Sequence, residues 1–276
     1  YTDVSENEGW WYEGGGIYRH VWLIKTDKIA VDLWGVYVNP QKNDNGWTVN
    51  TETTLINSSE NDEQVTVKSV ISDSNGKETG SAENVLDTYT WEKSTLNQQI
   101  EVKEPLLWDI DSPNLYTMTT YVYRNGNEID KTETKFGFRT FRFDSEKGFF
   151  LNGRNVKIKG VCSHQDYGLT GRAIPDNLHH YRAELIKEMG ANGYRTSHYP
   201  HAEAMMDALD ELGILVMDET RWYEATDEGK EQLASLIKRD RNHPSVILWS
   251  VGNEEPKHLT EQGRRIAQAL KALVLK

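Results

Sequence analysis

Near the end of the chain, Asn253 and Glu254 place an amide beside a carboxyl group shortly after the apolar segment 246–249. That segment predicts a strand, so both side chains would emerge at its carboxyl end. An acid kept protonated near neutral pH by an apolar, partly enclosed site can protonate a glycosidic oxygen, and an amide can hold a sugar hydroxyl. Glu254 is therefore our candidate general acid. An ordinary polar strand exit is the alternative, and the neighbouring Glu255 is interpreted that way.

Three further polar residues follow other apolar segments. Arg195 and His198 lie in the run 195–200, and His164 lies in the run 163–166. An arginine in a site pairs with carboxylates and lowers their pKa values, and a histidine can donate to a sugar hydroxyl. Each histidine alone is more often a satisfied structural side chain. Their occurrence together with Glu254 at separate strand ends favours a common site.

The elements that must position these residues alternate between apolar strands and amphipathic helices. Strands are expected at 156–162, 193–198, 214–217 and 246–249. The first helix should begin at Pro175, end at Gly190 and bury one stripe: Leu178, Tyr181, Leu185 and Met189. The second should bury Met205, Leu209 and Leu212 and end at Gly213, and further helices are expected through 233–237 and over 264–275.

This alternation is typical of parallel βα units. A doubly wound sheet would also fit it. Polar residues, however, follow the carboxyl ends of all four strands, where (β/α)8 barrels build their active sites. We therefore expect the first half of a TIM barrel.

The preceding residues have a different rhythm. Period-two stretches such as 65–71 predict half-buried strands, and Asn-Gly pairs at 45–46, 75–76, 125–126 and 152–153 predict tight turns. Short strands with frequent turns indicate an immunoglobulin-like β-sandwich. The fold class is therefore a multidomain β plus α/β chain, with the sandwich preceding the half-barrel.

Composition restricts the partners. The formal net charge is −12, which argues against nucleic acid, and no apolar run approaches the length of a membrane span. The single cysteine, Cys162, forms no internal disulfide, and we expect a cytoplasmic location. Histidine and carboxylate clusters at metal-ligand spacing are not seen, so no metal or other cofactor is expected. Asp/Asn-rich turns such as 43–46 are interpreted as plain turns.

Long motifs extend over nearly the whole chain in a fixed order: 10–19, 105–108 with 112–116, 150–153 with 159–161, 195–200, 239–246 and 252–254. They resemble glycoside hydrolase family 2, which includes β-galactosidases, β-glucuronidases and β-mannosidases. The resemblance implies three parts: the end of a jelly-roll sugar-binding domain (1–36), an immunoglobulin-like sandwich (37–143) and the amino-terminal half of a catalytic TIM barrel (144–276).

The resemblance also implies roles for individual residues. Glu254 matches the proton donor of a retaining mechanism, and Asn253 matches the residue that binds the sugar 2-hydroxyl. His164 and His198 match sugar-contacting histidines, and Arg195 matches the arginine beneath the catalytic carboxylates. Asp166 and Trp222 complete the expected substrate-binding set, Trp222 by stacking on the sugar.

Departures from the family pattern set the remaining alternatives. The family's nucleophile is a glutamate on the seventh barrel strand, which this chain does not reach, and the magnesium-binding Glu-Thr-His-Gly stretch of some β-galactosidases is replaced by other residues at 218–225. We expect a β-linked galactoside as substrate. A β-glucuronidase-type member and a non-catalytic sugar-binding or interaction fragment are the alternatives. The isolated chain should be inactive and should self-associate through the open half-barrel.

Overall fold

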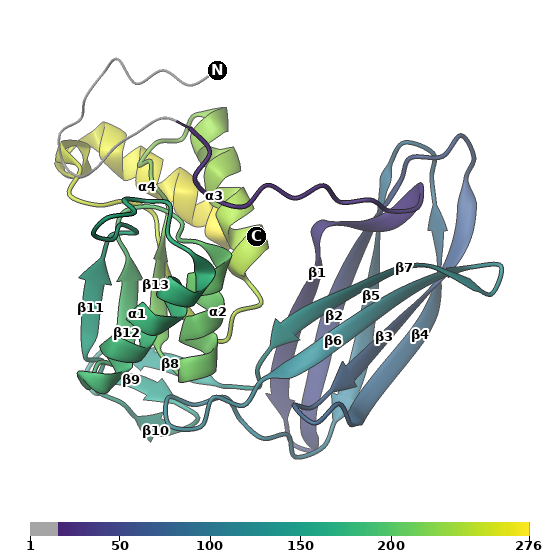
Figure 1. Ribbon diagram of the computed structural model, residues 1–276, viewed down its shortest axis with the longest axis horizontal. Helices are drawn as coiled ribbons and strands as arrows, with labels where there is room; N and C mark the ends of the chain where they lie inside the picture. The colour runs from purple at the N-terminus through teal and green to yellow at the C-terminus, as the bar shows by residue number, and fades with distance from the viewer. Residues whose placement is uncertain (1–15, 276) are drawn as a thin grey trace.

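Strands β1 to β7 form a two-sheet sandwich in the computed structural model, which describes residues 16–275 (Figure 1). One sheet has the order β1-β2-β5 and the other β4-β3-β6-β7, and neighbouring strands are antiparallel. The strands are β1 (Ile29–Asn43), β2 (Gly46–Asn57), β3 (Glu63–Ser72), β4 (Glu78–Thr88), β5 (Lys93–Val102), β6 (Tyr116–Arg124) and β7 (Asn127–Phe136). The predicted sandwich is confirmed.

The predicted Asn-Gly turn between β6 and β7 is present. Arg124 pairs with Asn127, so Asn125 and Gly126 alone connect the two strands. Both have positive φ, 52° and 78°, as a type I′ hairpin turn requires. A glycine tolerates that conformation without strain, and asparagine tolerates it better than most residues.

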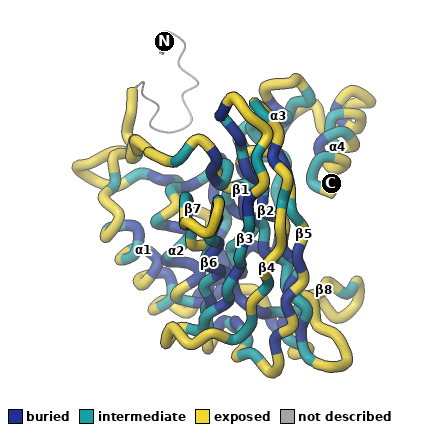
Figure 2. Tube along the Cα trace, turned by 90° about the vertical axis from the view of Figure 1, so that its right-hand side faces the viewer, coloured by how far each residue is buried: buried dark blue, intermediate teal, exposed yellow. Residues whose placement is uncertain are grey.

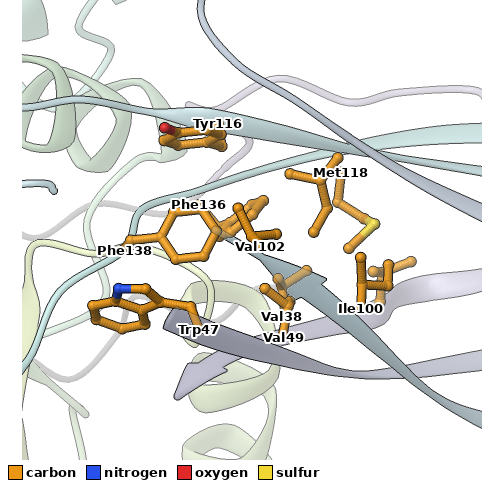
Figure 3. Close-up of a cluster of buried hydrophobic side chains, with 11 residues drawn as sticks. Val38, Trp47, Val49, Ile100, Val102, Tyr116, Met118, Phe136 and Phe138 are labelled. Carbon is orange, nitrogen blue, oxygen red and sulfur yellow. The ribbon is translucent and has the colours of Figure 1, made fainter. Parts of the chain in front are cut away.

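Alternate residues of the strands fill the core between the two sheets (Figure 3). Val38, Val49 and Ile100 come from β1, β2 and β5, and they meet Met118 and aromatic side chains from the facing sheet. Intervening residues such as those of β2 are less buried, which is the alternation that the period-two pattern predicts.

The second part of the chain contains a parallel sheet of order β11-β12-β13-β14 with helices packed on it (Figure 1). Its strands are β11 (Gly160–Ser163), β12 (Gly193–Thr196), β13 (Leu215–Glu219) and β14 (Val246–Ser250). The helices are α1 (Asp176–Glu188), α2 (Glu203–Leu212), α3 (Asp227–Asp240), the short 3₁₀ helix η1 (Pro256–Leu259) and α4 (Glu261–Val274). The four βα units of a partial TIM barrel are confirmed.

The predicted buried stripe of α1 was wrong. Its buried residues are His179, Ala183 and Ile186, whereas Tyr181 and Leu185 are exposed. α1 packs against α2, and small Ala183 lies in the core that it shares with Met206 and Leu209. The apolar residues of α1 therefore mark two faces, and only one of them is covered by described residues. α4 likewise buries few side chains, and much of it is exposed or half-buried (Figure 2).

A small antiparallel sheet joins the two parts. It consists of β8 (Phe141–Asp144), β9 (Gly148–Leu151) and β10 (Arg154–Asn155). Phe149 and Leu151 share one apolar cluster with Trp108 from the sandwich end and with Leu215 and Ile247 from the parallel strands. The sandwich, the small β8-β9-β10 sheet and the half-barrel are thus connected by a common buried core.

The segment expected to end a jelly roll, 1–36, is only partly described, and residues 1–15 lie outside the described residues. Residues 16–28 run without regular secondary structure, and β1 begins at Ile29, so the expected boundary at residue 36 falls within a strand that pairs with β2. The division into 1–36, 37–143 and 144–276 stays a proposal. None of the helices in residues 16–275 has the length and apolar character to cross a membrane.

Candidate active site

The candidate site lies at the carboxyl edge of the parallel sheet. β12 carries Arg195 one residue before its end, β13 ends at Glu219, and β14 ends at Ser250, with Glu219 opposite Ser250 in the register. Because parallel strands end at the same edge, side chains distant in sequence meet there. Each strand is short, and β12 and β13 are largely buried, which fixes the backbone from which their side chains project.

Arg195 is the centre of a hydrogen-bond network. Its Nε donates to Glu219 Oε2 at 2.8 Å, and its Nη2 donates to Glu219 Oε1 at 2.9 Å. Nη2 also donates to Asn253 Oδ1 at 2.7 Å and lies 3.2 Å from His198 Nδ1. Residues from three strand ends are therefore held by one planar guanidinium, whose fork matches a carboxylate.

Glu219 is the buried anion of this network. Its side chain is 1% exposed. His198 Nδ1 lies 2.8 Å from Oε1, and Ser250 Oγ donates to Oε2 at 2.6 Å, so both carboxylate oxygens have two partners. Burial acts to lower the pKa of Arg195, but the hydrogen bonds and the charge of Glu219 outweigh it and raise that pKa. The guanidinium is therefore a permanent positive charge at the floor of the site.

The two predicted histidines lie beside each other. The His164 and His198 rings are 5.1 Å apart, edge to face. Burial, together with His198, lowers the pKa of His164 from its usual value, which favours a neutral imidazole near neutral pH. A neutral imidazole can donate and accept a hydrogen bond, as recognition of a hydroxyl requires. His164 and His198 therefore form one polar wall beside Arg195.

Asn253 and Glu254 follow β14 in an irregular segment. Gly252 is needed there, because a Cβ at this position would lie 2.5 Å from Cδ2 of Tyr223. Asn253 Oδ1 accepts from Arg195 Nη2, so Asn253 joins the Arg195 network, and its predicted contact with a sugar hydroxyl stays a prediction. Glu254 is exposed, so the described residues do not supply the enclosing apolar surroundings that the sequence argument expected for the acid.

The remaining two predicted residues lie outside the Arg195 network as the described residues form it. The backbone carbonyl of Asp166 accepts a hydrogen bond from Arg182 Nη2 at 2.6 Å, and its side chain borders a separate hollow of about 550 Å³ with Tyr167 and Leu169. Trp222 is 39% exposed, and the Arg221 guanidinium lies 4.1 Å from the centre of its ring.

Sequence reasoning missed the structural roles of Glu219, Ser250 and Thr196. Thr196 Oγ1 accepts a hydrogen bond from the Glu219 backbone N–H at 2.8 Å and donates to Asp218 Oδ1 at 3.0 Å. The available signal was the Asp218-Glu219 pair directly after an apolar strand, since buried carboxylates at a strand end need a cationic partner. Arg195, one strand away, is that partner for Glu219.

Comparison with known proteins decides the family. Residues 31–139 match the model "Glycosyl hydrolases family 2", and residues 144–228 and 222–274 match "Glycosyl hydrolases family 2, TIM barrel domain". The chain belongs to glycoside hydrolase family 2. The matched segments correspond to the sandwich and to the half-barrel that carries the Arg195 network.

Individual relatives include two kinds of enzyme. A β-galactosidase of Bacteroides ovatus, BoGH2A, is 43% identical over an aligned length of 259 residues, and the match covers 88% of this chain and 30% of the relative. A putative β-glucuronidase of Formosa agariphila is 42% identical over an aligned length of 168 residues, and the match covers 56% of this chain and 16% of the relative. A solved family 2 structure from Bacteroides cellulosilyticus superposes with a TM-score of 0.90 at 34% identity, covering 96% of this chain and 37% of that one. This glycoside hydrolase chain thus spans about a third, or less, of these relatives.

Proposed function

We propose that this family 2 chain is the segment of a retaining β-glycosidase that carries the general acid/base, Glu254, and the floor of the sugar site. The observation that carries the proposal is the Arg195 network, in which one guanidinium joins Asn253, next to Glu254, to His198 and Glu219. Clustering of amide, imidazole and carboxylate groups at a barrel's strand ends suits recognition of a polyhydroxylated substrate.

In the proposed reaction, Glu254 gives its proton to the glycosidic oxygen as the bond to the anomeric carbon breaks, and a second carboxylate attacks that carbon. Glu254 then removes a proton from the water that releases the sugar. Glu219 does not suit the attacking role, because its oxygens already accept hydrogen bonds from Arg195 and Ser250 and its side chain is buried. The proposal gives Glu219 the task of fixing Arg195 and leaves the nucleophile outside this network.

The remaining site residues are proposed to bind the sugar. Asn253 would hold the 2-hydroxyl through its amide NH₂, because its Oδ1 already accepts from Arg195. His198 and His164 would contact ring hydroxyls. Asp166 and Trp222 would lie further from the reacting bond, consistent with their separation from the Arg195 network.

The test uses a chimera in which the matched part of this chain replaces the aligned segment of BoGH2A. We expect hydrolysis of nitrophenyl β-galactoside, and we expect Glu254→Gln to lower turnover of an unactivated disaccharide by about 10²–10⁴-fold with partial rescue by azide. Glu255→Gln is the matched control, because it removes a neighbouring carboxylate with no assigned role. An active chimera whose Glu254→Gln variant matches the Glu255→Gln variant would exclude Glu254 as the acid.

A β-glucuronide is the second candidate substrate, favoured by the 42% identity to the putative β-glucuronidase. The same chimera, assayed with nitrophenyl β-galactoside and nitrophenyl β-glucuronide, compares kcat/KM for the two sugars. We expect the galactoside to be preferred. A preference for the glucuronide would reassign the substrate class while leaving the role of Glu254 in place.

A further inference from the structure

A second cluster of charged side chains lies behind the candidate site. Asp218 and Asp240 are both fully buried, the first on β13 and the second at the end of α3. The charge and the carboxyl group of Asp240 act directly on Asp218, so the two acids are neighbours. Two neighbouring buried carboxylates repel each other when both are ionised, which favours a proton on one of the two acids.

The partners of each group show which acid is neutral. Arg239 donates to both oxygens of Asp240 at 2.6 Å, and His243 Nδ1 lies 2.6 Å from Asp210 Oδ2. These contacts form two oppositely charged pairs. The charge of Arg239 also acts on Asp218, but the hydrogen bonds that Arg239 makes within the described part of the chain go to Asp240. Among the described residues, no hydrogen-bond donor reaches the buried Oδ2 of Asp218, so an ionised Asp218 would leave this oxygen unsatisfied. A proton on Oδ2, donated to Asp240, satisfies it.

Other charges near the pair are already engaged. Arg19 acts on Arg239 and Asp240 electrostatically, but its Nη2 donates to the Gln165 side chain and to the Pro200 carbonyl. Glu203 of α2 acts on Arg239. Burial, followed by the charge of Asp240, raises the pKa of Asp218 well above its usual value, in agreement with the count of partners.

The neutral acid is connected to the site through one hydroxyl. Asp218 Oδ1 accepts from Thr196 Oγ1 at 3.0 Å, and Thr196 Oγ1 in turn accepts from the backbone N–H of Glu219 at 2.8 Å. Glu219 is the carboxylate that holds Arg195. The chain of hydrogen bonds from Asp218 through Thr196 and Glu219 to Arg195 is therefore continuous, and its first three residues are buried.

We propose that Asp218 is a positioning residue: it is a neutral acid that donates its proton to Asp240 and, through Thr196, fixes the backbone of Glu219 and with it the guanidinium of Arg195. This inference concerns the site of the proposed function and deepens it. Its test does not use glycosidase activity, so either proposal can fail without the other.

The test compares three variants of the 276-residue chain. Asp218→Asn keeps the shape, the acceptor for Thr196 and a donor for Asp240. Thr196→Val removes the connecting hydroxyl. Thr53→Val is the matched control, because Thr53 is an equally buried threonine in the sandwich.

The first measurement is solvent exchange of the Arg195 Nε–H by NMR, which reports whether the guanidinium stays on Glu219. We expect Thr196→Val to accelerate exchange by about tenfold, the equivalent of roughly one hydrogen bond, and Asp218→Asn and Thr53→Val to leave it unchanged. Equal exchange in Thr196→Val and Thr53→Val would overturn the positioning role.

The second measurement is urea unfolding from about pH 4 to about pH 8. The folded-state pKa of Asp218 is raised, so as pH rises above about 4 the unfolded chain releases this proton while the folded chain keeps it. The unfolding equilibrium constant of wild type should therefore grow by up to about tenfold per pH unit relative to Asp218→Asn, until Asp218 itself ionises. A pH-independent ratio would show that Asp218 carries no proton. Asparagine is isosteric with the neutral acid, so this measurement shows whether Asp218 carries a proton even if Thr196→Val does not fold.

Discussion

Replacement of Arg195 by methionine tests the central feature of the site, the pairing of one guanidinium with buried Glu219. Methionine keeps much of the volume of the side chain and removes its charge. The change takes two of the four hydrogen-bond partners from Glu219 and leaves His198 and Ser250. The buried carboxylate is then left without its cation.

The expected magnitude follows from the lost contacts. Two hydrogen bonds to a charged group contribute about 1.5–3 kcal/mol each, and removing one partner of a buried ion pair costs about 3–5 kcal/mol. We therefore expect Arg195→Met to lower the free energy of unfolding by about 3–5 kcal/mol. Arg195→Lys keeps the charge but not the planar fork, so we expect a loss of about 1–3 kcal/mol.

Urea unfolding followed by circular dichroism measures both losses. Arg142→Met is the control, because the ion pair of Arg142 with Asp144 is about half exposed and should contribute less than about 1 kcal/mol. If Arg195→Met destabilises the chain no more than Arg142→Met, then Glu219 does not depend on Arg195. The pairing of Arg195 with Glu219 would then not be what holds the site together.

Three further predictions follow from other parts of the chain. Burial opposes the charge of His243, but Asp210 and its neighbours raise the pKa of His243 to about 9. This shift should add about 3 kcal/mol to the free energy of unfolding below about pH 6.5, and the gain should be lost as pH rises through 9. The free energies of unfolding of wild type and His243→Gln should therefore converge near pH 9. Gly213→Ala should cost about 2 kcal/mol in urea unfolding, because φ is 66° and the new Cβ would lie 2.6 Å from the Ile110 carbonyl oxygen; unchanged stability would contradict this. The 276-residue chain should self-associate through the edge of β11, which carries exposed Cys162, so light scattering should exceed the monomer mass and alkylation of Cys162 should slow with protein concentration; a monomer with concentration-independent alkylation would contradict this.

Much of the fold could be predicted because its signals are local. An Asn-Gly pair such as 125–126 specifies a two-residue hairpin by backbone conformation alone, and Gly213 ends α2 in the left-handed conformation for the same reason. Apolar strands followed by polar residues identified the edge at which the site forms. These features depend on a few neighbouring residues, so the sequence contains them directly.

The contacts that complete the site are not local. Glu219 and Asn253 lie 24 and 58 residues after Arg195 in the sequence, and only the register of three strands brings them together. The prediction of the buried stripe of α1 was wrong for a related reason. The sequence shows which residues are apolar, but the neighbouring helix decides which face is covered. Burial of Asp218 and exposure of Glu254 were equally beyond any local pattern.

The apolar cluster beneath the parallel sheet has a consequence for how such proteins diversify. Trp108 from the sandwich end, Phe149 from the hairpin and Ile247 from β14 share that cluster, and the Trp108 indole N–H donates to the Asp210 carbonyl at 2.9 Å. A recombination event that joined this barrel segment to a foreign sandwich at residue 144 would leave Phe149 and Ile247 against an unmatched surface. Exchange of the two parts as one inherited block avoids that mismatch, so the unit of evolutionary shuffling is expected to be larger than either domain.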